Sequence, residues 1–191
     1  QTNSTGTVKR TIANNVALLF PIGNAAYNPL TITNKNAASD LFSARLADLV
    51  YLNGGSSGTL ITTPHVKATW NISKTMANTG SGVDFTFGWE SSQEQGLLTT
   101  FGLNHYNSIA PASWELAAGT SGTPSGTTTK TITHTGYTGT FSPFAIGESC
   151  SALPVELTAF SAVCNEAGVE VAWQTASEHN TGHFDVEKSR D

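Results

Sequence analysis

Two short patterns in the sequence resemble catalytic or metal-binding motifs. Residues 54–58 match G-x-S-x-G, in which a nucleophilic serine lies on a sharp turn between a strand and a helix. This run contains only Gly and Ser and no helical pattern follows it, so we expect a flexible loop instead. His179 and His183 have the spacing of two zinc ligands on one helix face. Turn-forming residues separate them and no Glu follows His179, so we expect a solvated pair.

Three carboxylates lie close together in the sequence, at Asp84, Glu90 and Glu94. Carboxylate oxygens bind calcium, and two carboxylates can act as acid and base on a glycosidic bond. Asp84, however, points away from the buried side of its predicted strand, and the two glutamates lie in a polar loop with no motif around them. The sequence therefore predicts no metal site, no cofactor and no catalytic residue.

The aromatic residues fall into two groups. Tyr106 and Trp114 lie beside predicted turns. Because exposed aromatic rings stack on the apolar faces of sugars, these two residues are the candidates for a glycan contact. The second group alternates with small or polar residues and is expected in the core. It consists of Trp70, Phe85, Phe87 and Trp89.

The two cysteines, Cys150 and Cys164, have no metal-ligand spacing around them. In a secreted protein they would pair and close a loop of about 15 residues, which stabilises the fold by roughly 3 kcal/mol in the chain-entropy model. The alternative is two separately buried thiols. Cys150 and Cys164 are therefore a candidate disulfide.

The composition favours an all-β protein that binds neither nucleic acid nor the membrane interior. Charged residues make up 12% of the chain, its polar side chains are mostly those of Thr, Ser and Asn, and Gly is also frequent. β-Branched Thr suits half-exposed strands, while Gly and Asn suit turns. The net charge of −5 and the pI near 5.4 argue against binding to phosphate groups. No apolar run approaches the roughly 18 residues that a membrane span needs.

Alternating apolar and polar residues predict roughly ten short strands before residue 147. Residues 66–72 and 83–89 show the clearest alternation, and the turn-forming segment between them predicts a hairpin. Residues 41–52 fit either a strand or one face of a helix, and the context favours a strand. Residues 118–129 are expected to form an exposed loop. Further predicted strands lie at residues 8–12, 16–20, 30–33, 60–61, 97–105, 113–116, 131–135 and 137–146, with a tight turn at Asn14 and Asn15.

The strand pattern pauses at residues 148–152, which we interpret as a linker. Residues 1–147 are predicted to form an antiparallel β-sandwich module. Alternation then restarts within residues 153–191, at 155–160, 169–173 and 183–187. Since three strands cannot close a sandwich, this second unit is expected to be incomplete and to have unpaired edges.

Residues on both sides of the linker carry a family resemblance. Residues 153–160, 171–180 and 184–189 closely resemble the opening strands of the fibronectin type III-like unit of Bacteroidetes surface proteins, which usually precedes a sorting domain for the type IX secretion system. The resemblance implies an immunoglobulin- or fibronectin-like second sandwich, export, and an extracellular or cell-surface location. It transfers no catalytic residue. The preceding residues are similar to the β-rich module that often stands before that unit, at 6–10, 20–24, 27–32 and 69–72.

The expected function is that of a non-enzymatic structural or adhesive module of a bacterial surface protein. Open strand edges in residues 153–190 also predict strand addition between copies, and hence a homo-oligomer, filament or layer. The alternative is a carbohydrate-binding accessory module of a secreted polysaccharide-degrading enzyme, with a surface glycan as its partner. An enzyme in its own right ranks third.

Overall fold

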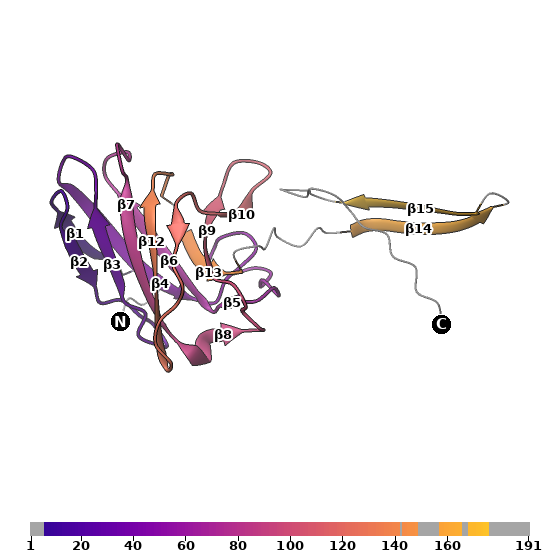
Figure 1. Cartoon of the computed structure of the whole chain (residues 1–191), viewed down its shortest axis with the longest axis horizontal. Helices are drawn as coiled ribbons and strands as arrows, with labels where there is room; N and C mark the ends of the chain where they lie inside the picture. Colours follow the sequence, from indigo (N-terminus) through magenta and orange to yellow (C-terminus); the bar gives the residue numbers. More distant parts are fainter. Residues whose placement is uncertain (1–5, 142, 149–156, 166–167, 176–191) are drawn as a thin grey trace. The chain divides into compact units, whose positions relative to one another are not determined.

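The computed structural model describes residues 6–141, 143–148, 157–165 and 168–175 (Figure 1). The chain divides into two compact units, with the boundary between Ser151 and Ala152. This boundary falls inside the segment that the sequence predicts to be a linker. No helix formed by the described residues is long and apolar enough to cross a membrane.

The first unit is a sandwich of two antiparallel sheets. The first sheet runs in the order β1-β4-β6-β13-β5-β8, with β9 paired to β13 and β10 paired to β9. Its strands are β1 (Val8–Ile12), β4 (Asp40–Asp48), β5 (His65–Val66), β6 (Ala68–Lys74), β8 (Glu94–Gln95), β9 (Gly102–Asn107), β10 (Ser113–Leu116) and β13 (Pro143–Gly147). A 3₁₀ turn, η1 (Ser91–Gln93), precedes β8.

The second sheet runs in the order β11-β12-β7-β3-β2. Its strands are β2 (Ala17–Phe20), β3 (Leu30–Asn34), β7 (Val83–Glu90), β11 (Thr120–Ser121) and β12 (Thr129–Tyr137). Buried side chains from both sheets form one core, in which the rings of Trp70 on β6 and Phe87 on β7 meet edge to face at 5.1 Å. The predicted all-β sandwich is therefore confirmed.

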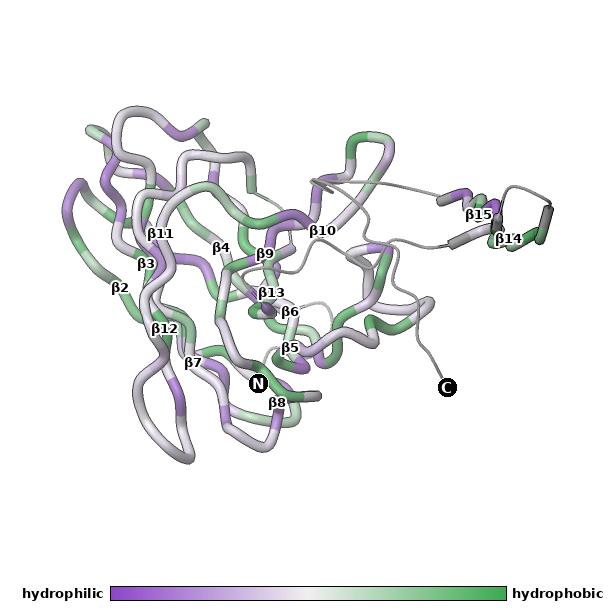
Figure 2. Tube along the Cα trace, turned by 45° about the vertical axis from the view of Figure 1, so that its right-hand side comes forward, coloured by the Kyte–Doolittle hydropathy of each residue, from purple (hydrophilic) through white to green (hydrophobic). Residues whose placement is uncertain are grey.

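A period of two in side-chain burial explains why these residues form strands. In β3 and β4, buried positions alternate with partly or fully exposed ones along most of each strand. Figure 2 shows hydrophobic and hydrophilic stretches distributed along the strands of this unit. The strands predicted at residues 8–12, 30–33, 66–72 and 83–89 are present, with ends that differ by a few residues.

The predicted hairpin between residues 66–72 and 83–89 is wrong, because the two strands lie in opposite sheets. β6 pairs with β4 and β13, whereas β7 pairs with β3 and β12. The chain between them crosses from one layer of the sandwich to the other. Alternation shows which side of a strand is buried. A hairpin within one sheet and two strands in opposite sheets bury the same aromatic side chains, so the pattern could not identify the pairing partner.

Other strand predictions need similar corrections. The tight turn predicted at Asn14 and Asn15 is present, since the Val16 amide donates to the Ala13 oxygen at 3.2 Å, but the strands on either side of it join different sheets, β1 beside β4 and β2 beside β3. The strand predicted at 41–52 ends at Asp48, and the strand predicted at 97–105 begins only at Gly102, because Leu97 is 79% exposed. The predicted loop at 118–129 contains the short strand β11. In total the first unit has thirteen strands among its described residues, whereas the sequence predicted about ten.

The described part of the second unit is a two-stranded antiparallel sheet. It consists of β14 (Leu157–Asn165) and β15 (Gly168–Thr175), which are paired along nearly their whole length, with an irregularity near Leu157. These strands overlap the strands predicted at 155–160 and 169–173. The third predicted strand, at 183–187, lies outside the described residues. The resemblance to a fibronectin type III-like unit therefore stays a prediction.

Candidate functional site

The two residues predicted to contact a glycan are packed against a loop of their own chain. Trp114 is only 5% exposed, and its Nε1 donates a hydrogen bond to the backbone oxygen of Tyr51 at 2.9 Å. Tyr106, its cross-strand partner, is half-buried and meets the Trp114 ring edge to face. Gly54 approaches so closely that a Cβ there would lie 2.4 Å from the Tyr106 ring. The expectation that Trp114 is exposed is wrong, and this pair anchors the loop instead.

The G-x-S-x-G sequence at residues 54–58 is a turn with no helix after it. The amide of Gly54 donates to the oxygen of Tyr51, and the Asn53 side chain accepts from the Gly55 amide and donates to the Ser57 oxygen. The Asn53 side chain thus holds both ends of the turn, and residues 54–58 are not helical. This geometry agrees with the expected loop and differs from the strand-to-helix turn that presents a nucleophile.

The three carboxylates considered as a calcium or acid-base site have separate partners. Asp84 accepts a hydrogen bond from the Gly136 amide at 2.9 Å and lies 3.7 Å from the Lys35 ammonium. Glu90 accepts from the Thr129 hydroxyl. Glu94 accepts from the Trp89 indole at 2.8 Å and pairs with Lys130 at 2.9 Å. No group of three metal-ligating side chains occurs among the described residues. The carboxylates thus tie neighbouring strands together.

A surface hollow of about 300 Å³ lies beside β9 and β10 and contains a His and a Glu. His105 and Glu115 are opposite each other in the β9–β10 register, on the face of this ribbon away from Tyr106 and Trp114. Asn107 donates to the Glu115 carboxylate at 2.9 Å. Burial lowers the pKa of His105, and the Glu115 charge opposes that effect. The lining contains one carboxylate, whereas glycoside hydrolysis normally uses two.

A Ser–His contact that the sequence did not predict has the composition of a nucleophile and its base. Ser121 Oγ lies 2.8 Å from Nδ1 of His134, and Nε2 of His134 lies 2.9 Å from the oxygen of Ala118. His134 is 1% exposed, so a substrate has no direct access to it. The Leu103 amide on β9 donates to the same Ser121 hydroxyl. The Ser–His contact thus joins β11 and β12 within the second sheet, and the hydrogen bond from Leu103 links Ser121 to the first sheet. No motif in the sequence signals this arrangement.

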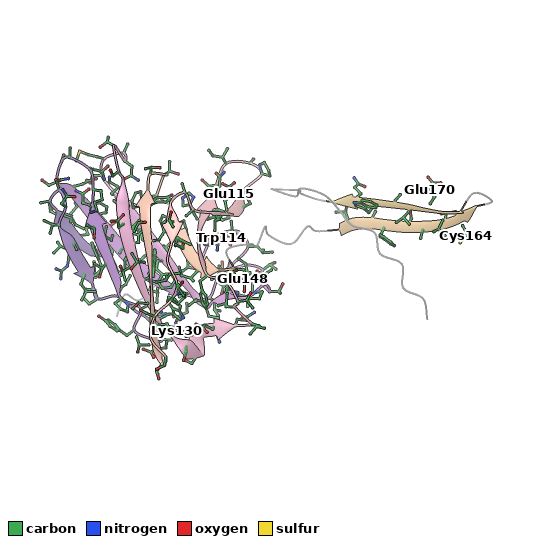
Figure 3. All side chains as sticks on the ribbon, in the orientation of Figure 1. Trp114, Glu115, Lys130, Glu148, Cys164 and Glu170 are labelled. Carbon is green, nitrogen blue, oxygen red and sulfur yellow. The ribbon has the colours of Figure 1, made fainter. Side chains whose placement is uncertain are left out.

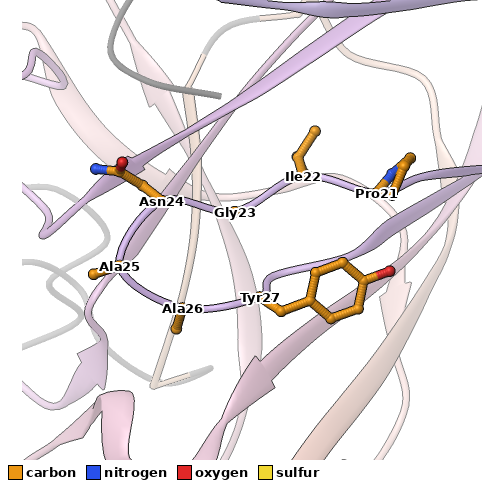
Figure 4. A pocket seen from close by; sticks show the side chains of 7 residues that line it. All are labelled: Pro21, Ile22, Gly23, Asn24, Ala25, Ala26 and Tyr27. Carbon is orange, nitrogen blue, oxygen red and sulfur yellow. The ribbon is translucent and has the colours of Figure 1, made fainter. Parts of the chain in front are cut away.

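A second hollow, of about 260 Å³, lies within the loop at residues 21–27 (Figure 4). The loop folds back on itself through a bridge between Gly23 and Tyr27, and Asp48 on β4 holds its tip by accepting from the Asn24 side chain and the Ala25 amide. Tyr27 is 51% exposed. Tyr27 lies outside any alternating segment, so no pattern in the sequence predicts its exposure.

The second unit presents one apolar and one mixed face. Residues paired across an antiparallel ribbon share a face, so three pairs in register form the apolar face: Phe160 with Trp173, Ala162 with Val171, and Cys164 with Val169. Phe160 is 66% exposed and Val169 is 61% exposed. Glu170 lies on the opposite face; Figure 3 labels it together with Cys164.

The predicted disulfide finds no support in the described residues. Cys164 is exposed on the apolar face of β14 and forms no disulfide with any of the described residues. Cys150 lies outside the described residues, so its pairing with Cys164 stays a prediction. His179 and His183 also lie outside them, and the interpretation as a solvated pair is untested.

Comparison of the chain with protein-family models, with curated proteins and with solved structures finds no match in any of the three.

Proposed function

We propose that this chain is a non-enzymatic structural or adhesive module of an exported bacterial surface protein, and that its second unit binds another copy of itself. The proposal rests on the apolar face of β14 and β15. Large apolar side chains occupy this face at the register positions that a sandwich core uses. A lone two-stranded ribbon is marginally stable in water, so a covering sheet would stabilise it. The partner is a second copy of the same ribbon.

The edges of the ribbon support the same proposal. Among the described residues, β14 pairs with β15 alone, and β15 pairs with β14 alone. Unpaired backbone N–H and C=O groups at such edges allow strand addition. Export and a surface location follow from the resemblance to type IX-secreted proteins, and the low content of charged residues is in keeping with it.

Sedimentation velocity over a range of protein concentrations, with a reducing agent to keep Cys164 as a thiol, tests this proposal. We expect the wild-type chain to associate and the Phe160→Ser variant to be at least ten times weaker in association. Val163→Ser is the matched control, because Val163 is 59% exposed on the opposite face of the same strand. A wild-type chain that stays monomeric at the highest concentration, or equal effects of both substitutions, would contradict the proposal.

Saccharide binding is the second candidate function, and the hollow at residues 21–27 is the observation that favours it. Tyr27 offers an exposed ring beside that hollow, and Asn24 and Asp48 supply polar groups near it. Exposed tyrosine faces stack on sugars, and amide and carboxylate groups bond to sugar hydroxyls. This location replaces the one predicted at Trp114.

A glycan array tests the second candidate. Binding that is lost in Tyr27→Ala but kept in Tyr27→Phe would assign it to the ring. Leu19→Ala is the control, since Leu19 is a 46% exposed side chain away from the hollow. An array without signal for the wild-type chain would reject saccharide binding.

A further inference from the structure

A lysine side chain is buried beside a carboxylate and a carboxamide at the point where the chain leaves β6. The side chains of Lys74 and Asp40 are only 3% and 2% exposed, and their charged atoms lie 3.4 Å apart. Lys74 Nζ also donates to Oδ1 of Asn78 at 2.9 Å. This nitrogen is therefore in contact with the side-chain amide group of Asn78. A buried amine next to an amide carbonyl has the geometry from which an amide exchange can start.

The Asn78 amide is held in place and polarised by its neighbours. Its Nδ2 donates to the backbone oxygen of Gly139 at 2.9 Å. Its Oδ1 accepts from Lys74 and also, at 3.4 Å, from Nδ2 of Asn36. A donor aimed at this oxygen stabilises the negative charge that develops there when a nucleophile adds to the carbonyl carbon.

Aromatic rings enclose the same lysine. Nζ of Lys74 lies 5.4 Å from the centre of the Phe42 ring and 5.8 Å from that of Phe141. The two rings also pack against each other. Exclusion of water protects the reacting groups from hydrolysis and strengthens the local electrostatic interactions.

We propose that Lys74 and Asn78 form an intramolecular amide cross-link. The Lys74 ammonium gives one proton to the Asp40 carboxylate, and the neutral Nζ bonds to Cγ of Asn78. The bond between Cγ and Nδ2 breaks, and the departing nitrogen takes a second proton from Nζ and leaves as ammonia. This ammonia recovers the first proton from Asp40 as ammonium. No oxidant, reductant or cofactor takes part.

Asn78, and not Asp40, is the electrophile in this cluster. The Asp40 carboxylate accepts hydrogen bonds from the backbone amides of Leu41, Thr75 and Met76. These donors hold the Asp40 carboxylate in place beside the Lys74 ammonium, and a carboxylate is a poor electrophile for an amine. The product closes a covalent ring across the start of the segment that joins the two sheets. The inference is independent of self-association.

Peptide-level mass spectrometry of the folded, purified chain tests the cross-link. Trypsin normally cleaves after Lys67, Lys74 and Lys130. We expect no cleavage after Lys74, and a joined peptide of residues 68–130 that is lighter than its sequence mass by about 17 Da, the mass of ammonia. The measurement is made on this peptide because an N-terminal Gln, such as Gln1, loses the same mass when it cyclises. Full cleavage at Lys74 with the unmodified mass would overturn the proposal.

Three variants assign the roles. Lys74→Arg keeps the charge but has no amine nucleophile, so its peptides should carry their full mass and be cleaved at position 74. Lys67→Arg is the matched control and should keep the cross-link. Asp40→Asn should retain the uncross-linked mass if it folds, as checked by its circular dichroism. A mass loss of about 17 Da in Lys74→Arg would identify a cyclised Asn instead and contradict the cross-link.

Discussion

Individual side chains in the sandwich core contact residues of both sheets. Phe87 is fully buried, and its ring contacts Trp70 across the core and Phe85 along its own strand, at 5.1 Å and 5.5 Å between ring centres. Trp114 is buried for a different reason, because it supports the loop whose Tyr51 carbonyl accepts a hydrogen bond from its Nε1. Phe87 thus fills the core between the two sheets, whereas Trp114 anchors a surface segment.

Replacement of Phe87 by Ala is expected to lower the free energy of unfolding by about 3 to 5 kcal/mol, since it leaves a cavity between the two sheets. Urea unfolding followed by tryptophan fluorescence measures this loss. Leu19→Ala, at a 46% exposed position, is the control and should change stability by less than about 1 kcal/mol. A loss below about 1 kcal/mol for Phe87→Ala would show that the ring is not part of the core.

The segment between β6 and β7 connects the two layers through side chains as well as through backbone. Asn36 donates to the oxygen of Gly82 and accepts from the amide of Thr79, while Asp40 accepts from the amides that begin the segment. Gly82 also donates to the Thr79 oxygen. Polar side chains from the β3–β4 connection and from β4 thus form hydrogen bonds with the backbone N–H and C=O groups of this segment.

Gly82→Ala is expected to weaken this crossing more than Gly80→Ala does. Both glycines have positive φ, 64° and 56°, so each substitution costs about 1 to 2 kcal/mol in backbone strain. A Cβ at Gly82 would also lie within van der Waals overlap of the Tyr137 oxygen, at 1.9 Å, whereas a Cβ at Gly80 meets no atom within 4 Å. Thermal unfolding of both variants gives the comparison. Equal losses would show that the contact with Tyr137 is relieved without cost.

In the whole first unit, half-buried or buried histidines connect stability to pH. Burial is the main cause that lowers the pKa of His65, His105 and His134 below its ordinary value. Each ring therefore binds a proton less readily in the folded chain than in the unfolded chain. The unfolded chain takes up protons on these rings below about pH 6.5, while the folded chain takes them up only at lower pH.

The free energy of unfolding is accordingly expected to be level above about pH 7 and to fall as the pH drops from about 6.5 through the lowered pKa values. Urea titrations at about pH 7.5, 6.5 and 5.5 cover the window in which histidines titrate and most carboxylates do not. His134→Gln should flatten part of this dependence. Stability that is constant across the window would contradict the inference that folding lowers the pKa of these rings.

Burial patterns along single strands could be predicted from the sequence, and strand partners could not. The alternation at 83–89 identified Phe85, Phe87 and Trp89 as core residues, and all three are fully buried. It could not place β7 beside β3 and β12. Pairing depends on which distant strand offers a matching edge and on how the connecting segment is held, and both are properties of the assembled sandwich.

The sequence by itself determined the all-β fold class and the inward side of the main strands. Side chains of a strand point alternately to its two sides, so a period of two in hydrophobicity can be recognised locally. Only the tertiary structure decided which polar residues meet. Asp40, Lys74 and Asn78 come together because β4 and β6 are neighbours and the chain then turns toward the second sheet. Trp114 is buried because a loop some sixty residues earlier covers it. Such contacts between distant residues arise when the sheets pack, and no local pattern records them.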